Sequence, residues 1–229
     1  MKLPRLVPSS FVERVNRFRV TVRIDGREAD AHLPNSGRLT ELLTPDRPCW
    51  VAPASSPRRQ TDYDLRLVQY AGVLVSVDAR LPNPLFAEAL EERRLAPFQT
   101  ARTFDREVSL GESRVDFALT MPGGVLWVET KSVTLVEAGT ARFPDAPTAR
   151  GTRHVQELNG VVDQGGRAAI VFVVQRPDAL RFTPHDGADP AFGAALRIAA
   201  DAGVRVHAWT CRVSQQAIAL ARQIPVDLT

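Results

Sequence analysis

The stretch "VDFALTMPGGVLWVETK", residues 115–131, decides the fold of the second half of the chain. It reads as two apolar strands joined by a turn at Pro122-Gly123-Gly124. Three ionisable residues, Asp116, Glu129 and Lys131, interrupt the apolar pattern. Side chains two apart in a strand share a face, so Glu129 and Lys131 point the same way. The turn folds Asp116 back beside Glu129, and we therefore expect two carboxylates and an ammonium to converge.

Two neighbouring carboxylates repel each other, and burying them is costly unless something compensates. A divalent cation does so, and Mg²⁺ takes oxygen ligands from one or two carboxylates, water and phosphate. The metal activates a bound water and stabilises charge on phosphorus, while Lys131 can hold the water or the phosphate. The pattern thus predicts an Mg²⁺ or Mn²⁺ site able to hydrolyse a phosphodiester. The alternative for Glu-x-Lys is an exposed ion pair worth ~0–1 kcal/mol.

The sequence around this hairpin alternates between helical and extended patterns. We expect helices over 80–95, 148–164, 188–202 and 214–222, and strands over 105–109, 113–121, 125–133, 167–174 and 204–210. This alternation predicts a mixed α/β domain with a central mixed sheet.

The N-terminal part of the chain consists of short strands and turns. Strands are expected over 17–24, 28–34, 48–54 and 64–78, with a short helix within 35–43 and a loop over 55–62. Short strands of this kind predict a small OB-like β-barrel. The change of pattern near Pro82 sets the predicted domains at 1–82 and 83–229.

Basic residues are concentrated in the N-terminal part of the chain. Residues 1–80 hold 13 basic and 9 acidic residues, whereas residues 81–229 hold 16 and 17. A positive face favours a polyanion partner such as DNA, through phosphate contacts and counterion release. Arg17 and Arg19 are candidates for these contacts, although a solvated basic face gives the same composition. Phe18 and Trp50 are candidates for stacking on bases, or for ordinary core positions.

The turn at "PNSG", residues 34–37, is a second candidate anion site. Ser36 is placed to cap the short helix expected after it, which would leave backbone N–H groups open to an anion. Asn35 and Arg38 flank this turn and are candidate nucleic-acid-binding residues.

Several classes of protein lack support in the sequence. No apolar run is long enough to span a membrane, and the basic first residues lack the apolar core of a secretory signal. The two cysteines, Cys49 and Cys211, are expected to be reduced thiols of a cytoplasmic protein. Phosphate-binding loops of the G-x-x-x-x-G-K-[ST] type, dinucleotide turns, C-x-x-C pairs and G-x-S-x-G elbows are absent.

The Asp…Glu-x-Lys pattern resembles the PD-(D/E)xK nuclease superfamily. Across nearly the whole chain, the sequence resembles the sugar fermentation stimulation protein A (SfsA) family. The matching stretches are "PNSGRL" (34–39), "EVSLGESRVDF" (107–117), "VETKSVTL" (128–135), "FPDAPTARGTRHVQEL" (143–158) and "RF" (181–182). The resemblance implies an N-terminal OB-like domain, a C-terminal nuclease-like domain, and a DNA-binding protein linked to sugar metabolism.

The resemblance also implies roles for single residues. Asp116 and Glu129 become metal ligands as well as catalytic residues, and Lys131 becomes the catalytic lysine. Thr130 stands where the family usually has an apolar residue, and we expect it to face away from the site. Further matching positions follow: Glu107, Arg114 and His154 as possible accessory residues, Glu112 at the turn beside Arg114, and Arg150 as a phosphate contact.

Two functions remain open from the sequence. One is a DNA-binding protein, without strong preference for base sequence, that carries a metal-dependent nuclease-like site. The other is a regulator that keeps the nuclease fold without turnover. An enzyme of carbohydrate metabolism is suggested by the family's name alone. The sequence gives no indication of the oligomeric state.

Overall fold

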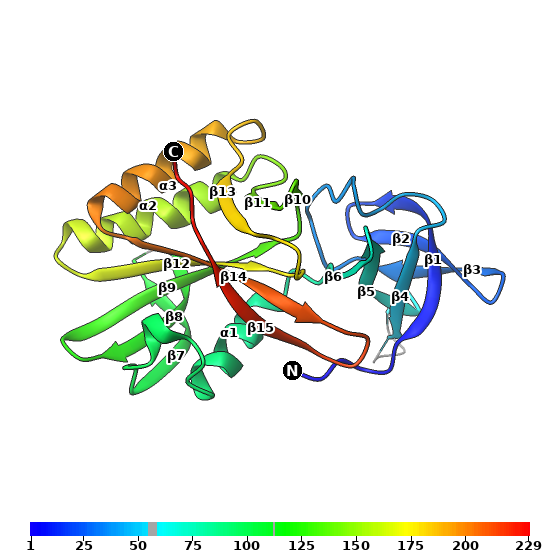
Figure 1. Ribbon diagram of the computed structural model, residues 1–229, viewed down its shortest axis with the longest axis horizontal. Coiled ribbons are helices and arrows are strands. Elements are labelled where there is room, and N and C mark those ends of the chain that lie inside the picture. Colours follow the sequence, from blue (N-terminus) through cyan, green and yellow to red (C-terminus); the bar gives the residue numbers. More distant parts are fainter. Residues whose placement is uncertain (55–58, 112) are drawn as a thin grey trace.

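The computed structural model describes residues 1–54, 59–111 and 113–229, and it places two β-structures side by side (Figure 1). One is formed by the first third of the chain and the other by the rest. No helix of the described residues is both long and apolar enough to cross a membrane.

Five strands of the first third form the predicted OB barrel. They run in the order β3-β2-β1-β4-β5, and parallel pairing of β3 with β5 closes the sheet on itself. Alternate side chains such as Val20 and Val22 are fully buried inside, as period-two patterning requires. The strands are β1 (Val7–Asn16), β2 (Arg19–Ile24), β3 (Arg27–His32), β4 (Pro48–Pro53) and β5 (Tyr63–Tyr70).

Two strand predictions in the barrel need correction. The first strand begins at Val7, ahead of the stretch assigned to strands. The single strand expected over 64–78 is a hairpin, because Ala71 and Gly72 take positive φ angles and turn the chain into β6 (Val73–Ser76). Residues 55–58 of the expected loop lie outside the described residues.

The short helix expected within 35–43 does not form, and Ser36 therefore caps nothing. Leu42 N and Leu43 N donate to the Leu39 carbonyl in one isolated turn, and other backbone groups of this segment find partners elsewhere. The Asn35 side chain accepts a hydrogen bond from Gly37 N (2.8 Å), and the Arg14 guanidinium donates to the Gly37 carbonyl (2.8 Å). Leu39 takes a φ of +53°, which ends any helical path.

The second sheet has six strands in the order β15-β14-β12-β9-β8-β7. At its centre, β12 pairs in parallel with both β9 and β14, while the outer pairs are antiparallel. A strand covered on both faces reads as a continuous apolar run, as β12 does. The strands are β7 (Thr103–Leu110), β8 (Ser113–Met121), β9 (Gly124–Val133), β12 (Arg167–Val174), β14 (Arg205–Val213) and β15 (Ile218–Ile224).

Helices cover both faces of this sheet, so that each face has its own core. Helix α1 (Pro82–Glu91) and the 3₁₀ turn η1 (Ala96–Phe98) pack on one face, around Phe86 and Phe117. Helices α2 (Ala149–Asp163) and α3 (Pro190–Ala202) pack side by side on the other. The mixed α/β architecture is as predicted.

The last expected helix is wrong. Residues 218–222 belong to β15, an edge strand antiparallel to β14, in which Ile218 and Leu220 are buried. A small sheet of β10 (Val136–Glu137), β11 (Thr140–Phe143) and β13 (Arg181–Pro184) was not anticipated. Strands of two to four residues leave too little pattern to recognise.

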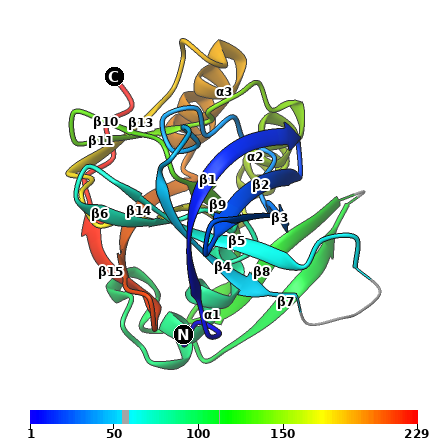
Figure 2. The ribbon, with the colours of Figure 1, turned by 90° about the vertical axis from the view of Figure 1, so that its right-hand side faces the viewer.

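The two parts of the molecule are joined through polar contacts. Leu3 N donates to the Gln216 carbonyl (2.8 Å), so the chain before β1 lies against the second sheet and beside α1 (Figure 2). The buried side chain of Gln175, which follows β12, hydrogen-bonds to Ser76 (2.9 Å) and Ser132 (2.8 Å). The division at residue 82 stays a prediction, since the first residues of the chain pack with the second part.

Candidate functional site

The candidate site forms where strands β8 and β9 part. Their backbone pairing runs from Met121 and Gly124 to Phe117 and Val128. Beyond that pair, the backbone N–H groups of Asp116 and Thr130 donate to side-chain carboxylates instead of to backbone carbonyls. Thr130 N donates to Asp116 Oδ2 (2.8 Å), and Asp116 N donates to Glu129 Oε2 (3.3 Å).

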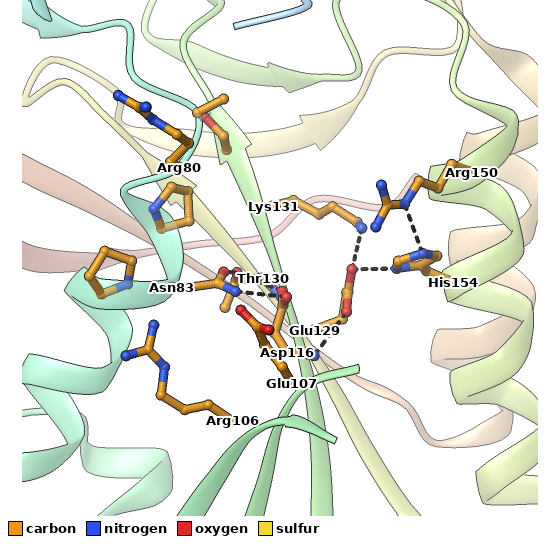
Figure 3. Close-up of a pocket in the computed structure, with 14 residues that line it drawn as sticks. Arg80, Asn83, Arg106, Glu107, Asp116, Glu129, Thr130, Lys131, Arg150 and His154 are labelled. Atoms are coloured by element: carbon orange, nitrogen blue, oxygen red, sulfur yellow. Dashed lines mark hydrogen bonds and ion pairs between the residues drawn. The ribbon is translucent and has the colours of Figure 1, made fainter. Parts of the chain in front are cut away.

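These carboxylates line a cavity of about 390 Å³ (Figure 3). The structure brings Asp116, Glu129 and Lys131 together there, as the hairpin pattern predicted. Polar and charged side chains dominate the wall, and they come from α1, β7, β8, β9 and α2. Side chains from both faces of the second sheet therefore contribute to the wall of the cavity.

Glu129 is the most densely partnered group of the site and is only 4% exposed. Its Oε1 accepts a hydrogen bond from Lys131 Nζ (2.7 Å) and a short one from His154 Nδ1. Burial opposes ionisation of Glu129, but these two partners outweigh it and hold its pKa below the ordinary value. Glu129 is therefore a buried carboxylate that stays charged.

The pKa of Asp116 is shifted in the opposite direction from that of Glu129. Burial and the nearby charge of Glu129 raise its pKa above the ordinary value, against the hydrogen bonds from Thr130 and Asn83. The two carboxylates thus repel each other, as the sequence suggested. A positive charge placed between them would relieve that repulsion.

Asn83 is a site residue that the sequence did not reveal. It lies in the first turn of α1, and its Nδ2 donates to Asp116 Oδ1 (2.8 Å). In the sequence, Pro82-Asn83-Pro84 is typical of a linker or a helix entry. Its polar role depends on α1 packing against β8 and β9, which no local pattern encodes.

The expectation for Thr130 was wrong. Its side chain does point away from Glu129, since it meets Asn83 on α1 whereas Glu129 meets His154 on α2. However, its Oγ1 lies 2.8 Å from Asp116 Oδ2 and lines the cavity. Strands β8 and β9 part at this point, so side chains on both faces of the sheet contact Asp116.

The hydrogen bonds of His154 fix its tautomer. Arg150 Nε, which can only donate, lies 3.3 Å from His154 Nε2. Nε2 is therefore an acceptor, and Nδ1 carries the proton that is donated to Glu129. Residues 150 and 154 are one helical turn apart on α2, and both line the cavity as their spacing predicted.

Glu107 and Arg114 occupy more exposed positions. Glu107 lies opposite Asp116, between the paired residues Arg106 and Val108, and takes a φ of +52° that is unusual for a residue with a side chain. It lines the cavity, but its side chain is 68% exposed. Arg114 is exposed beside it, at 4.0 Å from Glu107. Glu112 lies outside the described residues.

Arginines surround the cavity. Arg80, Arg106 and Arg150 all line it, and only Arg150 was expected there. Arg80 is held by Asp78, through its Nε (2.8 Å) and a terminal nitrogen (2.7 Å). These arginines place positive charge at the wall of a cavity that Glu107, Asp116 and Glu129 also line, which favours an anionic ligand at the arginines.

The expected nucleic-acid-binding residues of the barrel lie apart from this cavity. Arg17 is exposed in the turn between β1 and β2, and Arg38 is also exposed. Arg19 forms an ion pair with Asp30. Asn35 is buried, and its Nδ2 donates to the Val77 carbonyl (3.1 Å), which gives it a structural role.

Two carboxylates and the surrounding polar groups fit a divalent cation bound partly through water and substrate. The mutual repulsion between Asp116 and Glu129 is the observation that fits, since a cation would remove it. Within residues 1–54, 59–111 and 113–229, however, no three histidine, cysteine or acidic side chains are arranged as a metal site.

Two family models match the chain. One is described as the SfsA N-terminal OB domain and matches residues 12–77. The other is described as the sugar fermentation stimulation protein RE domain and matches residues 80–217. Together they account for most of the sequence.

Proteins of several organisms are similar to the chain over its whole length. A sugar fermentation stimulation protein homolog of Desulforamulus reducens is 42% identical over 99% of this chain and 94% of its own. That of Moorella thermoacetica is 44% identical over the full length of both. The structure of Pyrococcus furiosus SfsA in complex with Ca²⁺ superposes with a TM-score of 0.91 and 34% identity, covering 99% of this chain and 98% of that one.

Proposed function

The chain belongs to the sugar fermentation stimulation protein (SfsA) family, and we propose that it binds DNA and hydrolyses phosphodiesters at the Asp116–Glu129–Lys131 site with a divalent metal ion. The observation that carries the proposal is the pair of buried, mutually repelling carboxylates in a cavity surrounded by arginines. The Pyrococcus relative, which was solved with Ca²⁺, supports a cation that prefers oxygen ligands.

Asp116 and Glu129 would hold the metal, either Mg²⁺ or Mn²⁺. When bound, the metal supplies an activated water and stabilises negative charge on phosphorus. Glu129 stays ionised through Lys131 and His154, so its carboxylate is ready for a cation without first losing a proton. Asn83 and Thr130 keep the Asp116 carboxylate in place.

Lys131 supplies a positive charge beside the two carboxylates. Its Nζ hydrogen-bonds to Glu129 in this state and is mostly buried. The ammonium would hold the attacking water or a phosphate oxygen. Arg106 and Arg150 at the cavity wall would bind the flanking phosphates and position the strand.

A second candidate function is DNA binding without turnover, in a regulator that keeps the nuclease fold. The observation that favours it is that every oxygen of Asp116 and Glu129 already has a hydrogen-bond partner within the protein. A site that is fully partnered without metal can persist as a structural network. The family's name supports a link to sugar metabolism only loosely.

One experiment separates the two functions. We expect Mg²⁺ or Mn²⁺ to raise the melting temperature of the wild type and to support cleavage of plasmid, single-stranded DNA or RNA. Asp116→Asn should lose most of the metal-dependent gain in melting temperature, and Lys131→Ala should lose cleavage while it still binds the metal.

Lys2→Ala is a matched control, because Lys2 is the other lysine of the chain and lies away from the cavity. It should cleave as the wild type does. A metal-induced gain in Asp116→Asn equal to that of the wild type would reject the metal site. Metal binding and DNA binding without any cleavage would favour the non-catalytic regulator.

A further inference from the structure

Phe18 is an exposed aromatic residue at the tip of the turn between β1 and β2. Its side chain is 46% exposed, and it is the one aromatic among the large apolar residues that are exposed in the described part of the chain. The ring of His32, at the end of β3, lies beside it with centroids 6.4 Å apart. Two flat rings are thus presented together at the surface of the barrel.

Hydrogen bonds hold the backbone of the turn that carries Phe18, and they hold the ring of His32. Phe18 N donates to Asn16 Oδ1 (2.9 Å), and the Phe18 carbonyl accepts from Leu33 N (2.9 Å) and from His32 Nδ1 (3.0 Å). Because a carbonyl can only accept, His32 Nδ1 carries a proton, and its ring is fixed against the turn. A turn that is already ordered loses less conformational entropy when a ligand binds to it.

The ring pair lines two cavities, of about 450 and 500 Å³, each within the range of ligand sites, roughly 300–1,000 Å³. Arg80 also lines both of them. The same Arg80 lines the cavity that contains Asp116 and Glu129. One side chain thus connects the surface of the barrel with the candidate site of the second domain.

The surroundings of the rings are positively charged. The Arg17 guanidinium lies 5.4 Å from the centre of the Phe18 ring and, among the described residues, has no carboxylate partner. Arg19 and Arg80 line the first of these cavities with the rings and add charge, although Asp30 and Asp78 partly neutralise them. Aromatic faces among arginines are the arrangement that binds bases and phosphates of single strands.

We propose that Phe18 and His32 form a stacking platform for an unpaired base of a single-stranded nucleic acid, whose backbone passes Arg80 toward the Asp116 cavity. The proposal rests on the proposed function, and it names the substrate class of that site. A base within a duplex has both faces covered by its neighbours. Only an unpaired base has a free face for the platform.

Fluorescence anisotropy with labelled oligonucleotides tests the proposal, in EDTA so that cleavage does not interfere. The probes are an oligothymidine of about 12 nucleotides, an abasic strand of equal length and a duplex of equal length. Phe18→Ala should bind oligothymidine roughly 5- to 150-fold more weakly, the range found for loss of one stacked base. Its affinity for the abasic strand and for the duplex should change less than about 2-fold.

Two variants serve as controls. Phe18→Trp keeps a stacking surface and should retain binding of oligothymidine. Val125→Ala removes a similarly exposed apolar side chain at the start of β9, in the other sheet, and should have no effect. Phe18 is exposed, so Phe18→Ala should melt close to the wild type.

The outcomes distinguish the platform from the proposed function. Equal binding of oligothymidine by Phe18→Ala and the wild type, or an equal loss on the abasic strand, would overturn the platform and leave the metal site untouched. A wild type that binds none of the three probes would overturn both the platform and DNA binding. Selective loss on oligothymidine, restored by Phe18→Trp, would support the platform.

Discussion

At the scale of single residues, Asp116 is a group that the fold tolerates at a cost. Its carboxylate is buried beside the ionised Glu129, and both effects raise its pKa. A carboxyl whose pKa is higher in the folded state than in the unfolded state destabilises the fold once it is ionised. This penalty is absent below the unfolded pKa of about 3.9 and is complete above the raised folded pKa.

We therefore predict that Asp116→Asn raises the stability of the metal-free protein at neutral pH. The neutral amide keeps an oxygen for Thr130 N, and the Asn83 amide can rotate to accept from the new NH₂ group. The gain should be on the order of 1 kcal/mol, or about 2–4 °C in melting temperature. Thermal melts in EDTA at neutral pH and near pH 3 measure it.

The pH series provides the control for that prediction. The difference between Asp116→Asn and the wild type should shrink toward zero in acid, where Asp116 is protonated in both folded and unfolded chains. A variant less stable than the wild type at neutral pH in EDTA would show that Asp116 is held by its hydrogen bonds more strongly than it is repelled by Glu129.

Single residues of the site differ in how far the sequence reveals them. Asp116, Glu129 and Lys131 interrupt apolar strands, so alternation and one turn were enough to bring them together. Asn83 and Thr130 give no such signal, because one lies between two prolines and the other looks like an outward-facing strand residue. Their contacts with Asp116 arise only when α1 packs across the point where β8 and β9 part.

At the scale of elements, strands and helices were recognisable where the apolar pattern was clear, whereas β1 (Val7–Asn16) was missed although it has ten residues. Strand β12 and helix α2 were predicted almost to their ends because each has a continuous pattern. The helix predicted over residues 214–222 was wrong because the sequence "SQQAIALAR" favours a helix locally. Pairing along the free edge of β14 outweighs that preference, as tertiary contacts often do.

The beginning of helix α2 positions Arg150 and His154, and a single side chain secures it. Asp189 accepts a hydrogen bond from Phe192 N (3.0 Å) as the N-cap of α3, and another from Thr148 N (2.7 Å) immediately before α2. One buried carboxylate thus fixes the start of two helices. Thr148 in turn caps α2 by accepting from Gly151 N (3.1 Å).

We predict that Asp189→Ala lowers the free energy of unfolding by about 2–3 kcal/mol, more than the ~1 kcal/mol of an ordinary cap. Two backbone N–H groups lose their acceptor in a buried position. Denaturant unfolding measures the loss. Asp201→Ala, an exposed acidic residue in the last turn of α3, is the matched control and should change stability by less than about 0.5 kcal/mol. Equal effects of the two substitutions would show that the double cap contributes nothing.

At the scale of the whole molecule, the barrel and the second sheet are joined beside the candidate site. The side chain of Gln175 is fully buried, and its Nε2 donates to the Asp78 carbonyl (3.0 Å) and to Ser132 Oγ (2.8 Å). Ser132 follows Lys131 on β9, and Asp78 holds Arg80. The joint therefore links the strand of the candidate lysine with the arginine that leads to the barrel surface.

This joint could not be predicted from the sequence. Gln175 follows an apolar strand and resembles any polar residue at a strand end. Its partners Ser132 and Ser76 lie 43 and 99 residues away in the sequence. A single sequence carries no signal for polar contacts at such separations, whereas it does carry the periodicity of the elements that make them.

The joint makes a prediction about the whole molecule. Gln175→Met keeps the volume of the side chain but leaves Ser76, Ser132 and the Asp78 carbonyl without their partner. Each buried polar group left unpaired costs about 1–3 kcal/mol, so we expect a loss of several kcal/mol. Because the lost contacts join the two parts, the barrel should then unfold separately from the second sheet, and denaturant unfolding should no longer be two-state. Gln223→Met, on the exposed edge strand β15, is the matched control and should unfold as the wild type does. A single transition at the wild-type midpoint in Gln175→Met would show that other contacts join the two parts.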